Sequence, residues 1–531
     1  MSSLDIQLPR WSIYVLILIS ATAAQAGRIA STRSATGELP FYSANDRSRW
    51  CTLVSLVEQG TFQIDEVVQR TDPERKNRKP WNTIDMVRHR GEDGKQHYYS
   101  SKPPFLTTIY ASVYWVFNKA TNKTLTAEPF FVARSLLLIV NLLPLLGYWL
   151  LLIWLIERPT LDPWSRIFLV FASVWALYSS TFASTLNNHL PGTIAVLVSL
   201  VALIRITIDQ SQHWVWPLLC GLSASFAIAC ELPALAWWAI LVPLLYITTR
   251  KLKPAILYVA ASIPVAAGIL ITTQLAHGDL RPPYMHREAG AVVTTAARNA
   301  SDTTPESSLP ALKEALTSAG NKLSDKLEIR QARQAEPPTW ELLDTEQQYC
   351  WAVQAGEGTW ELRQWDDWYD YPNTYWVPEK KSGVDKGETS VPLYAFHTLI
   401  GHRGIFSLTP LWFFAIFGAV IAWNKQPQWR IIHLAAIIVS IVCIGFFIAR
   451  PLDDRNYGGV CSGFRWVFWL APLWMLFLPH GIEAVSRSLW GRRLALTALA
   501  ISIFSATFPW NNPWTQPWTF QILEYFAWIK Y

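Results

Sequence analysis

Eleven runs of apolar residues, each long enough to cross the roughly 30 Å hydrocarbon core of a bilayer as a helix, restrict what this chain can fold into. They lie near residues 12–28, 131–156, 165–184, 190–208, 213–231, 233–249, 254–276, 404–424, 431–449, 464–482 and 493–510. Because 51% of the residues are hydrophobic and only 16% are charged, we expect an all-α polytopic membrane protein with about eleven transmembrane helices.

The charge balance and the cysteines argue against two other classes of protein. Lys and Arg number 45 against 39 Asp and Glu, a surplus that basic residues gathered at one membrane face explain without a nucleic-acid partner. The six cysteines form no CxxC or CxxH spacing, which argues against a zinc module or a disulfide scaffold. A metal ion, if the protein uses one, must be held by carboxylate or histidine side chains.

The distribution of Lys and Arg predicts the orientation of the chain, because short cytoplasmic loops carry the excess of basic residues. Arg10 and the cluster at 250–253 share one face with most other basic loops only if the short apolar segment 104–118 does not cross. We therefore expect 104–118 to lie in the outer interface, with the N-terminus cytoplasmic and the C-terminus extracytoplasmic. Residues 1–30 can also be interpreted as a signal peptide with a cleavage site at Ala24-Gln25-Ala26.

This topology divides the chain into membrane and extracytoplasmic parts. They are a first transmembrane helix (1–28), an extracytoplasmic loop with amphipathic interfacial helices (29–130), helices two to seven (131–276), an aromatic-rich extracytoplasmic domain of mixed structure (277–403), helices eight to eleven (404–510) and an extracytoplasmic tail (511–531). Within the aromatic-rich domain we expect a partly helical stretch, 285–345, and then short strands and turns in 346–378. The aromatic residues of 346–378 suit either a lid over bound sugar or the core of a small folded domain.

The first outer loop contains a carboxylate at the start of a predicted helix. Residues 46–58 place Trp50, Leu53 and Val54 on one helical face, and Gly60 fits as the end of the helix. Asp46 lies near the positive N-terminal end, where an ionised carboxylate is favoured. It is either a functional carboxylate at the level of the lipid headgroups or the cap of a surface helix.

A lysine leads into the interfacial segment of the same loop. In His97-Tyr-Tyr-Ser-Ser-Lys102-Pro103-Pro104, the ammonium group of Lys102 is expected at headgroup depth, where it suits a lipid phosphate. The alternative is an ordinary snorkelling lysine.

These residues resemble a known motif. Asp46-Arg-Ser-Arg49-Trp50, a helix ending at Gly60, and Tyr99-Ser-Ser-Lys102-Pro-Pro are similar to the D-E-x-R-Y … G-D-W … Y-x-x-K-P-P pattern of GT-C glycosyltransferases, in particular the bacterial aminoarabinose transferase and protein O-mannosyltransferase type. The resemblance covers roughly residues 12–280. It implies a catalytic role for Asp46, substrate binding by Arg49, and approach of Lys102 to the donor phosphate.

The resemblance also implies partners and a location. Such enzymes transfer a sugar from a polyprenyl-phosphate donor to a lipid, glycan or protein acceptor at the outer face of the cell (inner) membrane, among membrane lipids and without nucleic acid. The sequence departs from the pattern where a second Asp often stands: Asn187-Asn188-His189 occupies that position. His189 is a candidate base or metal ligand, or part of a polar turn that caps the next helix, and a divalent metal cofactor is left open.

Further candidates lie at other outward turns. Glu231, between two apolar runs, is a carboxylate at the edge of the hydrocarbon and therefore a functional candidate, or else a helix-end residue that reaches water. The loop Arg450-Pro-Leu-Asp453-Asp454-Arg455 and the following Arg465 suit binding of phosphate or sugar hydroxyls, with a self-satisfied Asp/Arg loop as the alternative.

The sequence therefore predicts an inverting glycosyltransferase that transfers a hexose or a pentose. Asp46 acts as base, and Lys102 with Arg465 or Arg455 receives the lipid phosphate. A non-catalytic GT-C-like protein, or a transporter or scaffold of cell-envelope assembly, is the alternative. Transporters place ionisable groups at the bilayer midplane, whereas here the charged residues avoid the interiors of the runs.

Overall fold

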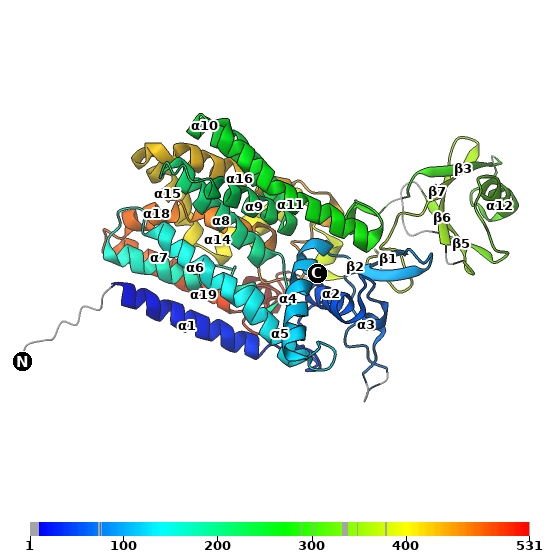
Figure 1. Cartoon of the computed structure of the whole chain (residues 1–531), viewed down its shortest axis with the longest axis horizontal. Helices are drawn as coiled ribbons and strands as arrows, with labels where there is room; N and C mark the ends of the chain where they lie inside the picture. Colours follow the sequence, from blue (N-terminus) through cyan, green and yellow to red (C-terminus); the bar gives the residue numbers. More distant parts are fainter. Residues whose placement is uncertain are drawn as a thin grey trace, which may run out of the picture. The chain divides into compact units, whose positions relative to one another are not determined.

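The structure is a computed structural model that describes residues 10–529, except 73–74, 76, 288, 300, 332–337, 348 and 378–379 (Figure 1). The chain divides into two compact units. The first is made of Met1–Asp46, Ser112–Ile269 and Ser382–Tyr531, and the second of Arg47–Ala111 and Leu270–Lys381.

Seven helices in the described part of the chain are long and apolar enough to cross a membrane. They are α1 (Arg10–Ala30), the continuous helix Pro129–Ile156 formed by α5 (Pro129–Leu137), η2 (Leu138–Leu142) and α6 (Leu143–Ile156), α8 (His189–Thr207), Leu232–Thr249 with α10 (Leu235–Thr249), α11 (Leu252–His277), Pro427–Ile448 with α16 (Arg430–Ile448), and α19 (Leu489–Thr507). The protein is thus mainly helical and polytopic, as its apolar runs indicate.

The other four apolar runs fold differently from the long helices that the sequence predicts. The run 165–184 forms α7 (Pro163–Trp175), which ends before the buried polar residues Ser179 and Ser180. The runs 213–231 and 404–424 give shorter helices, α9 (Val215–Cys230) and α15 (Leu411–Lys425).

The last of the four, 464–482, is a bent segment. It consists of η10 (Arg465–Leu470), α17 (Ala471–Trp474) and α18 (Leu478–Val485), with a bend of 66° at the break. Pro472 and Pro479 stand in the first turns of α17 and α18, where proline is tolerated but cannot continue a preceding helix. Counting this pair as one broken span gives eight.

The two helices expected in residues 29–130 form as predicted, but one of them is packed differently. The helix α2 (Ala44–Val54) continues as the π-helix η1 (Ser55–Gln59), and Gly60, with a φ of 75°, ends it. Ser48 through Ser55 are all buried, so this segment does not expose a polar face. The helix α4 (Pro104–Thr121) does not meet the length and hydropathy test for a membrane span.

Within the first unit, several helices pack so closely that their backbones are in contact. Figure 1 shows α1, α6 and α7 running side by side. Where α15 meets α18, a Cβ added to Gly418 would lie 2.1 Å from the carbonyl oxygen of Phe477, and one added to Gly481 would lie 2.0 Å from that of Phe414. Each glycine therefore permits an approach that any side chain would block.

We expect Gly481→Ala to lower the free energy of unfolding by about 1–3 kcal/mol, because the helices must separate to admit the methyl group. The loss is measurable as a lower Tm in detergent. Gly445→Ala in α16 is the matched control, because nothing lies within 4 Å of a Cβ added there. Equal Tm values for the two variants would contradict the close crossing.

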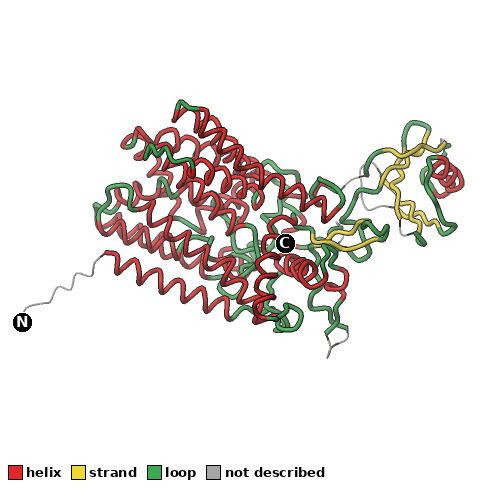
Figure 2. Tube along the Cα trace, in the orientation of Figure 1, coloured by secondary structure: helices red, strands yellow, loops and turns green. Residues whose placement is uncertain are grey.

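The second unit holds all the described strands, drawn in yellow in Figure 2. A hairpin pairs β1 (Met86–Arg90) with β2 (Gln96–Ser100). An antiparallel sheet has the order β3-β7-β6-β5-β4, formed by β3 (Val292–Ala297), β4 (Leu327–Gln331), β5 (Thr339–Asp344), β6 (Tyr349–Ala355) and β7 (Thr359–Gln364).

The core of this small sheet accounts for part of the aromatic residues of 346–378. Trp340, Trp351 and Trp360 are buried against α12 (Leu309–Ser318), which is the helical part expected in 285–345. Trp351 and Trp360 thus belong to the core of a small folded sheet, whereas Trp368 and Tyr369 pack in a separate cluster with Val87 and Tyr99.

The remaining short helices connect these parts. They are α3 (Asp65–Gln69), α13 (Val391–Leu399), α14 (Ile405–Leu408) and α20 (Trp518–Tyr525), with 3-10 turns η3 (Thr181–Ser184), η4 (Leu232–Ala234), η5 (Pro283–Met285), η6 (Glu306–Ser308), η7 (Gly383–Lys386), η8 (Pro427–Trp429) and η9 (Leu452–Asp454).

Candidate functional site

Asp46 is fully buried and does not cap its own helix. Ser43 takes that place, since its hydroxyl accepts a hydrogen bond from the Asp46 N–H at 3.2 Å. The carboxylate accepts from the backbone N–H of Tyr42 at 3.1 Å and from that of Leu186 at 2.9 Å. Asp46 therefore joins the start of α2 to the segment before α8, and the interpretation as a surface-helix cap is wrong.

The segment that Asp46 reaches is also held by Asn141, from the helix Pro129–Ile156. This asparagine lies in the π-helical turn η2 and is fully buried. Its side-chain NH2 donates to the carbonyl of Ala183 at 2.8 Å and to that of Thr185 at 2.7 Å. π-Helical turns often occur at functional positions. An asparagine inside an apolar run is the sequence signal that could have identified this residue.

His189 and Glu231, from α8 and the end of α9, form a buried pair. The His189 Nδ1 lies 2.5 Å from a carboxylate oxygen of Glu231, and the Asn188 side chain donates to the same oxygen at 2.9 Å. Gly192 allows this approach, since a Cβ there would lie 3.2 Å from the Cγ of Glu231. Glu231 is thus a buried partner of His189 and not a helix-end residue that reaches water.

Arg465 completes a chain of three side chains. Its Nη1 lies 2.8 Å from the Nε2 of His189. A guanidinium group can only donate hydrogen bonds, so Nε2 must accept, and the proton of the neutral imidazole must sit on Nδ1 and point to Glu231. Both ring nitrogens of His189 are therefore engaged, and the imidazole connects a carboxylate to a cation.

The guanidinium group of Arg465 is fixed in place by backbone and aromatic contacts. Its Nε donates to the Gly458 carbonyl at 2.8 Å, and its Cζ lies 4.8 Å from the centroid of the Trp514 ring. A Cβ at Gly458 would lie 3.0 Å from this Nε, which explains a glycine there. Within the described part of the chain, no carboxylate forms an ion pair with Arg465. A fixed cation of this kind suits an anionic ligand.

The loop before Arg465 is largely satisfied by itself. Arg455 donates to the carbonyls of Glu388, Thr389 and Arg450, and Arg450 pairs with Asp454 at 2.8 Å. Asp453 is exposed. The Arg450–Asp454 pair fits the alternative of a self-satisfied Asp/Arg loop, whereas Arg455 is bonded mainly to the separate segment 388–389.

The other motif residues belong to the second unit. Lys102 forms an ion pair with Asp85 at 3.0 Å, and Arg49 is buried. Lys102 also lines a pocket whose other polar side chains are Thr52, Tyr99, Ser100, Thr107 and His277. A Lys102 that merely snorkels is not what the structure shows, because its ammonium has a specific carboxylate partner.

The residues of the site do not fit a metal ion. No group of three or more His, Cys, Asp or Glu side chains arranged to hold a metal occurs among the described residues. His189 has no ring nitrogen left for a metal, because Glu231 and Arg465 engage both. We therefore derive no catalytic step through a metal ion.

Comparison with known proteins gives structural neighbours only. No protein-family model and no curated protein matches the sequence. One neighbour is the oligosaccharyltransferase AglB from Archaeoglobus fulgidus in complex with an inhibitory peptide and a dolichol-phosphate (12% identity over 95% of this chain and 56% of that one, TM-score 0.44). Another is the S. cerevisiae protein O-mannosyltransferase Pmt1-Pmt2 complex bound to the sugar donor (9% identity over 99% of this chain and 93% of that one, TM-score 0.46).

The chain spans little more than half of the archaeal enzyme's length.

Proposed function

We propose that the protein is an inverting glycosyltransferase that moves a hexose or pentose from a polyprenyl-phosphate donor to a lipid, glycan or protein acceptor at the outer face of the cell membrane. The observation that carries the proposal is the buried carboxylate of Asp46, which is hydrogen-bonded to the segment that leads into His189. His189 in turn contacts Glu231 and Arg465. A buried carboxylate and a fixed cation in one unit are the two charges that glycosyl transfer from a lipid phosphate needs.

In the proposed reaction, an acceptor hydroxyl attacks C1 of the sugar. Asp46 orients this hydroxyl and takes its proton as the new C–O bond forms. The bond between C1 and the phosphate oxygen breaks, and the lipid phosphate leaves with the electron pair. Arg465 stabilises the charge that develops on the leaving phosphate. For Lys102 we propose, from the motif alone, a role in binding the donor phosphate.

His189 acts in this scheme through Arg465 rather than on the substrate. Both its ring nitrogens are engaged, so the imidazole is a poor candidate for the base or metal ligand that its position in the motif first indicated. We propose that Glu231 accepts the hydrogen bond from Nδ1 of His189, and that Nε2 then accepts one N–H of the guanidinium of Arg465. Glu231 and His189 are thus positioning residues.

We expect Lys102→Ala to weaken donor binding by about 10- to 100-fold, the usual value of a hydrogen bond to a charged group, with a smaller effect on kcat. The KM for the donor, measured with reconstituted protein, tests this. The variant leaves Asp85 without its ion pair, so the double variant Lys102→Ala/Asp85→Asn serves as the control. Recovery of the wild-type KM in the double variant would contradict phosphate binding by Lys102.

The proposed topology has eleven crossings, with a cytoplasmic N-terminus and an extracytoplasmic C-terminus. Single cysteines at the exposed positions Asp453 and Tyr525, in a cysteine-free background, should react with an impermeant maleimide in cells stripped of any outer barrier. A cysteine at the exposed Lys251 should react only after permeabilisation. Labelling of position 251 from outside would overturn the orientation and the location of the site.

A further inference from the structure

The pocket that Lys102 lines in the second unit contains a histidine that the proposed reaction does not use. His277, the last residue of α11, is 8% exposed, and its Nε2 has no hydrogen-bond partner among the described residues. The pocket is also lined by Lys102 and by four residues that carry a hydroxyl group, Thr52, Tyr99, Ser100 and Thr107.

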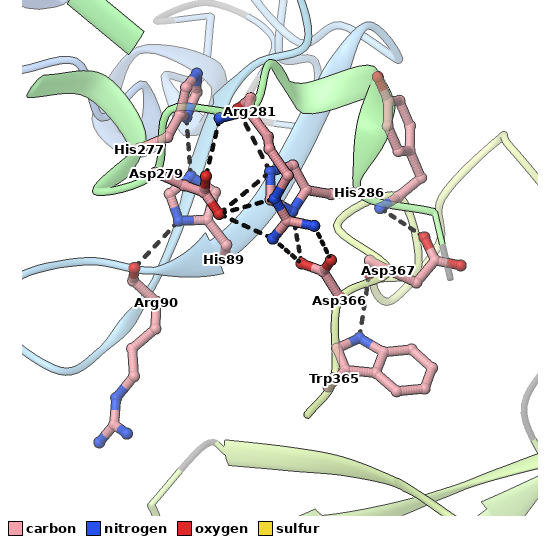
Figure 3. A network of polar contacts seen from close by, with 10 residues as sticks. His89, Arg90, His277, Asp279, Arg281, His286, Trp365, Asp366 and Asp367 are labelled. Atoms are coloured by element: carbon pink, nitrogen blue, oxygen red, sulfur yellow. Dashed lines mark hydrogen bonds and ion pairs between the residues drawn. The ribbon is translucent and has the colours of Figure 1, made fainter. Parts of the chain in front are cut away.

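A chain of hydrogen bonds that starts at a backbone carbonyl determines which ring nitrogen of His277 carries the proton. Figure 3 shows the contacts of this chain. The Nδ1 of His89 lies 3.1 Å from the Arg90 carbonyl oxygen, which can only accept. His89 stacks on Tyr99 at 4.1 Å and lies 4.1 Å from the ring of Trp368, and burial lowers the pKa of His89 to about 4. His89 is therefore neutral at pH 7, with its proton on Nδ1.

The second step of this chain determines what His277 can offer to a ligand. The Nε2 of His89 carries a lone pair and lies 3.0 Å from the Nδ1 of His277. The Nδ1 of His277 must therefore donate. A neutral His277 then has a lone pair, and not a proton, at Nε2. Leaving this buried acceptor without a hydrogen bond costs free energy, so a donor group is needed opposite it.

The charges in the pocket narrow the class of ligand. Lys102 is paired with Asp85, so the two charges cancel, and His277 adds an acceptor rather than a second cation. A hydroxyl group can donate to an imidazole lone pair and also accept from an ammonium or another hydroxyl, so it is the ligand group that suits this pocket. In a polyprenyl-phosphate sugar, the hydroxyl groups next to C1 lie beside the phosphate that Lys102 is proposed to bind.

We propose that Nε2 of His277 accepts a hydrogen bond from a hydroxyl of the lipid-linked sugar, so that this pocket recognises the sugar as well as the phosphate of the donor. This proposal rests on the proposed function. His277 recognises the sugar, and Lys102 recognises the phosphate. His89 and the Arg90 carbonyl keep the proton on Nδ1 of His277, so that its Nε2 can accept a hydrogen bond. A donor without the hydroxyl would leave the imidazole acceptor unpaired, which is a strong basis for discrimination.

The test compares lipids that differ only in the sugar. Full-length protein in nanodiscs is titrated with polyprenyl phosphate, with its mannosyl and glucosyl forms and their 2-deoxy forms, and with free mannose and glucose. We expect the wild type to bind at least one glycosylated lipid about 3- to 10-fold more tightly than the bare lipid, the value of one buried neutral hydrogen bond. His277→Leu should remove this preference and leave the affinity for the bare lipid unchanged.

The affinity for the bare lipid reports whether the variant is folded. His277→Gln, which keeps an acceptor oxygen, should retain part of the preference for the glycosylated lipid. His213→Leu, an exposed histidine of the first unit, is the matched control and should behave as wild type. Tight binding of a free sugar would indicate that the pocket binds a glycan acceptor, and it would overturn the assignment of the pocket to the donor.

A wild type that binds all lipids equally, or a His277→Leu variant that keeps the preference or loses the bare lipid as well, would also overturn the proposal. Failure of every lipid to bind the wild type would instead overturn the proposed function.

Discussion

Asp46→Asn is expected to lower the rate of sugar transfer by about 10²- to 10⁴-fold, the range found for loss of a catalytic base. The substitution keeps the size of the side chain and removes its charge and its basicity. The carboxylate accepts from the N–H groups of Tyr42 and Leu186, and an amide can accept through only one oxygen. Transfer of labelled sugar by membranes containing equal amounts of each variant measures the effect.

Two controls separate catalysis from folding in this experiment. Asp325→Asn, at a side chain that is 99% exposed, should leave the rate unchanged. Hydrogen exchange over residues 181–189 reports whether the segment joined to Asp46 has loosened. Near-wild-type transfer by Asp46→Asn would mean that the carboxylate serves only to join the two segments, and that the base lies elsewhere.

The second large effect is expected at Arg465. Removing its guanidinium in Arg465→Gln should lower kcat by about 10²- to 10³-fold, as does removal of a group that stabilises charge in a transition state. Arg465→Lys should recover little, because an ammonium cannot bond His189 and the Gly458 carbonyl through the same planar fork.

Glu231→Gln and His189→Gln test the coupling behind this effect. If both residues act through Arg465, each single variant loses part of the rate in kcat, and the double variant loses little more than the worse single one. Additive losses would contradict the chain Glu231–His189–Arg465. A change in donor KM alone would assign these residues to ground-state binding.

The helical membrane fold could be predicted from the sequence, because apolar length is a property of each run by itself. The prediction is wrong where contacts with residues distant in the sequence determine the conformation. After α7 ends at Trp175, Ser180 donates to the carbonyl of Leu177 and Thr181 to that of Ala506, contacts that depend on the turns and on a distant segment. Pro472 and Pro479 break the run 464–482, although its composition is as apolar as that of an intact span.

The candidate site could be predicted one residue at a time but not as a set. Glu231 stood out as a carboxylate at the edge of an apolar run, and His189 by its place in the motif. That they pair depends on how α8 packs on α9, which no local pattern contains. Arg455 shows the converse error, since backbone carbonyls that the sequence does not reveal occupy its guanidinium group.

Asn141 was missed for the same reason. Its two hydrogen bonds depend on the π-helical turn, which turns the side chain toward the segment 183–185.

The lipids of cells without this protein test the central claim most directly. Mass spectrometry of membrane extracts would compare wild type with a deletion strain and with the same strain carrying either the wild-type or the Asp46→Asn chain. The account predicts that a polyprenyl-phosphate-linked sugar accumulates, and that a surface glycan is lost, in the deletion strain and in the Asp46→Asn strain alone. An unchanged pool of glycosylated polyprenyl phosphate in the deletion strain would contradict it.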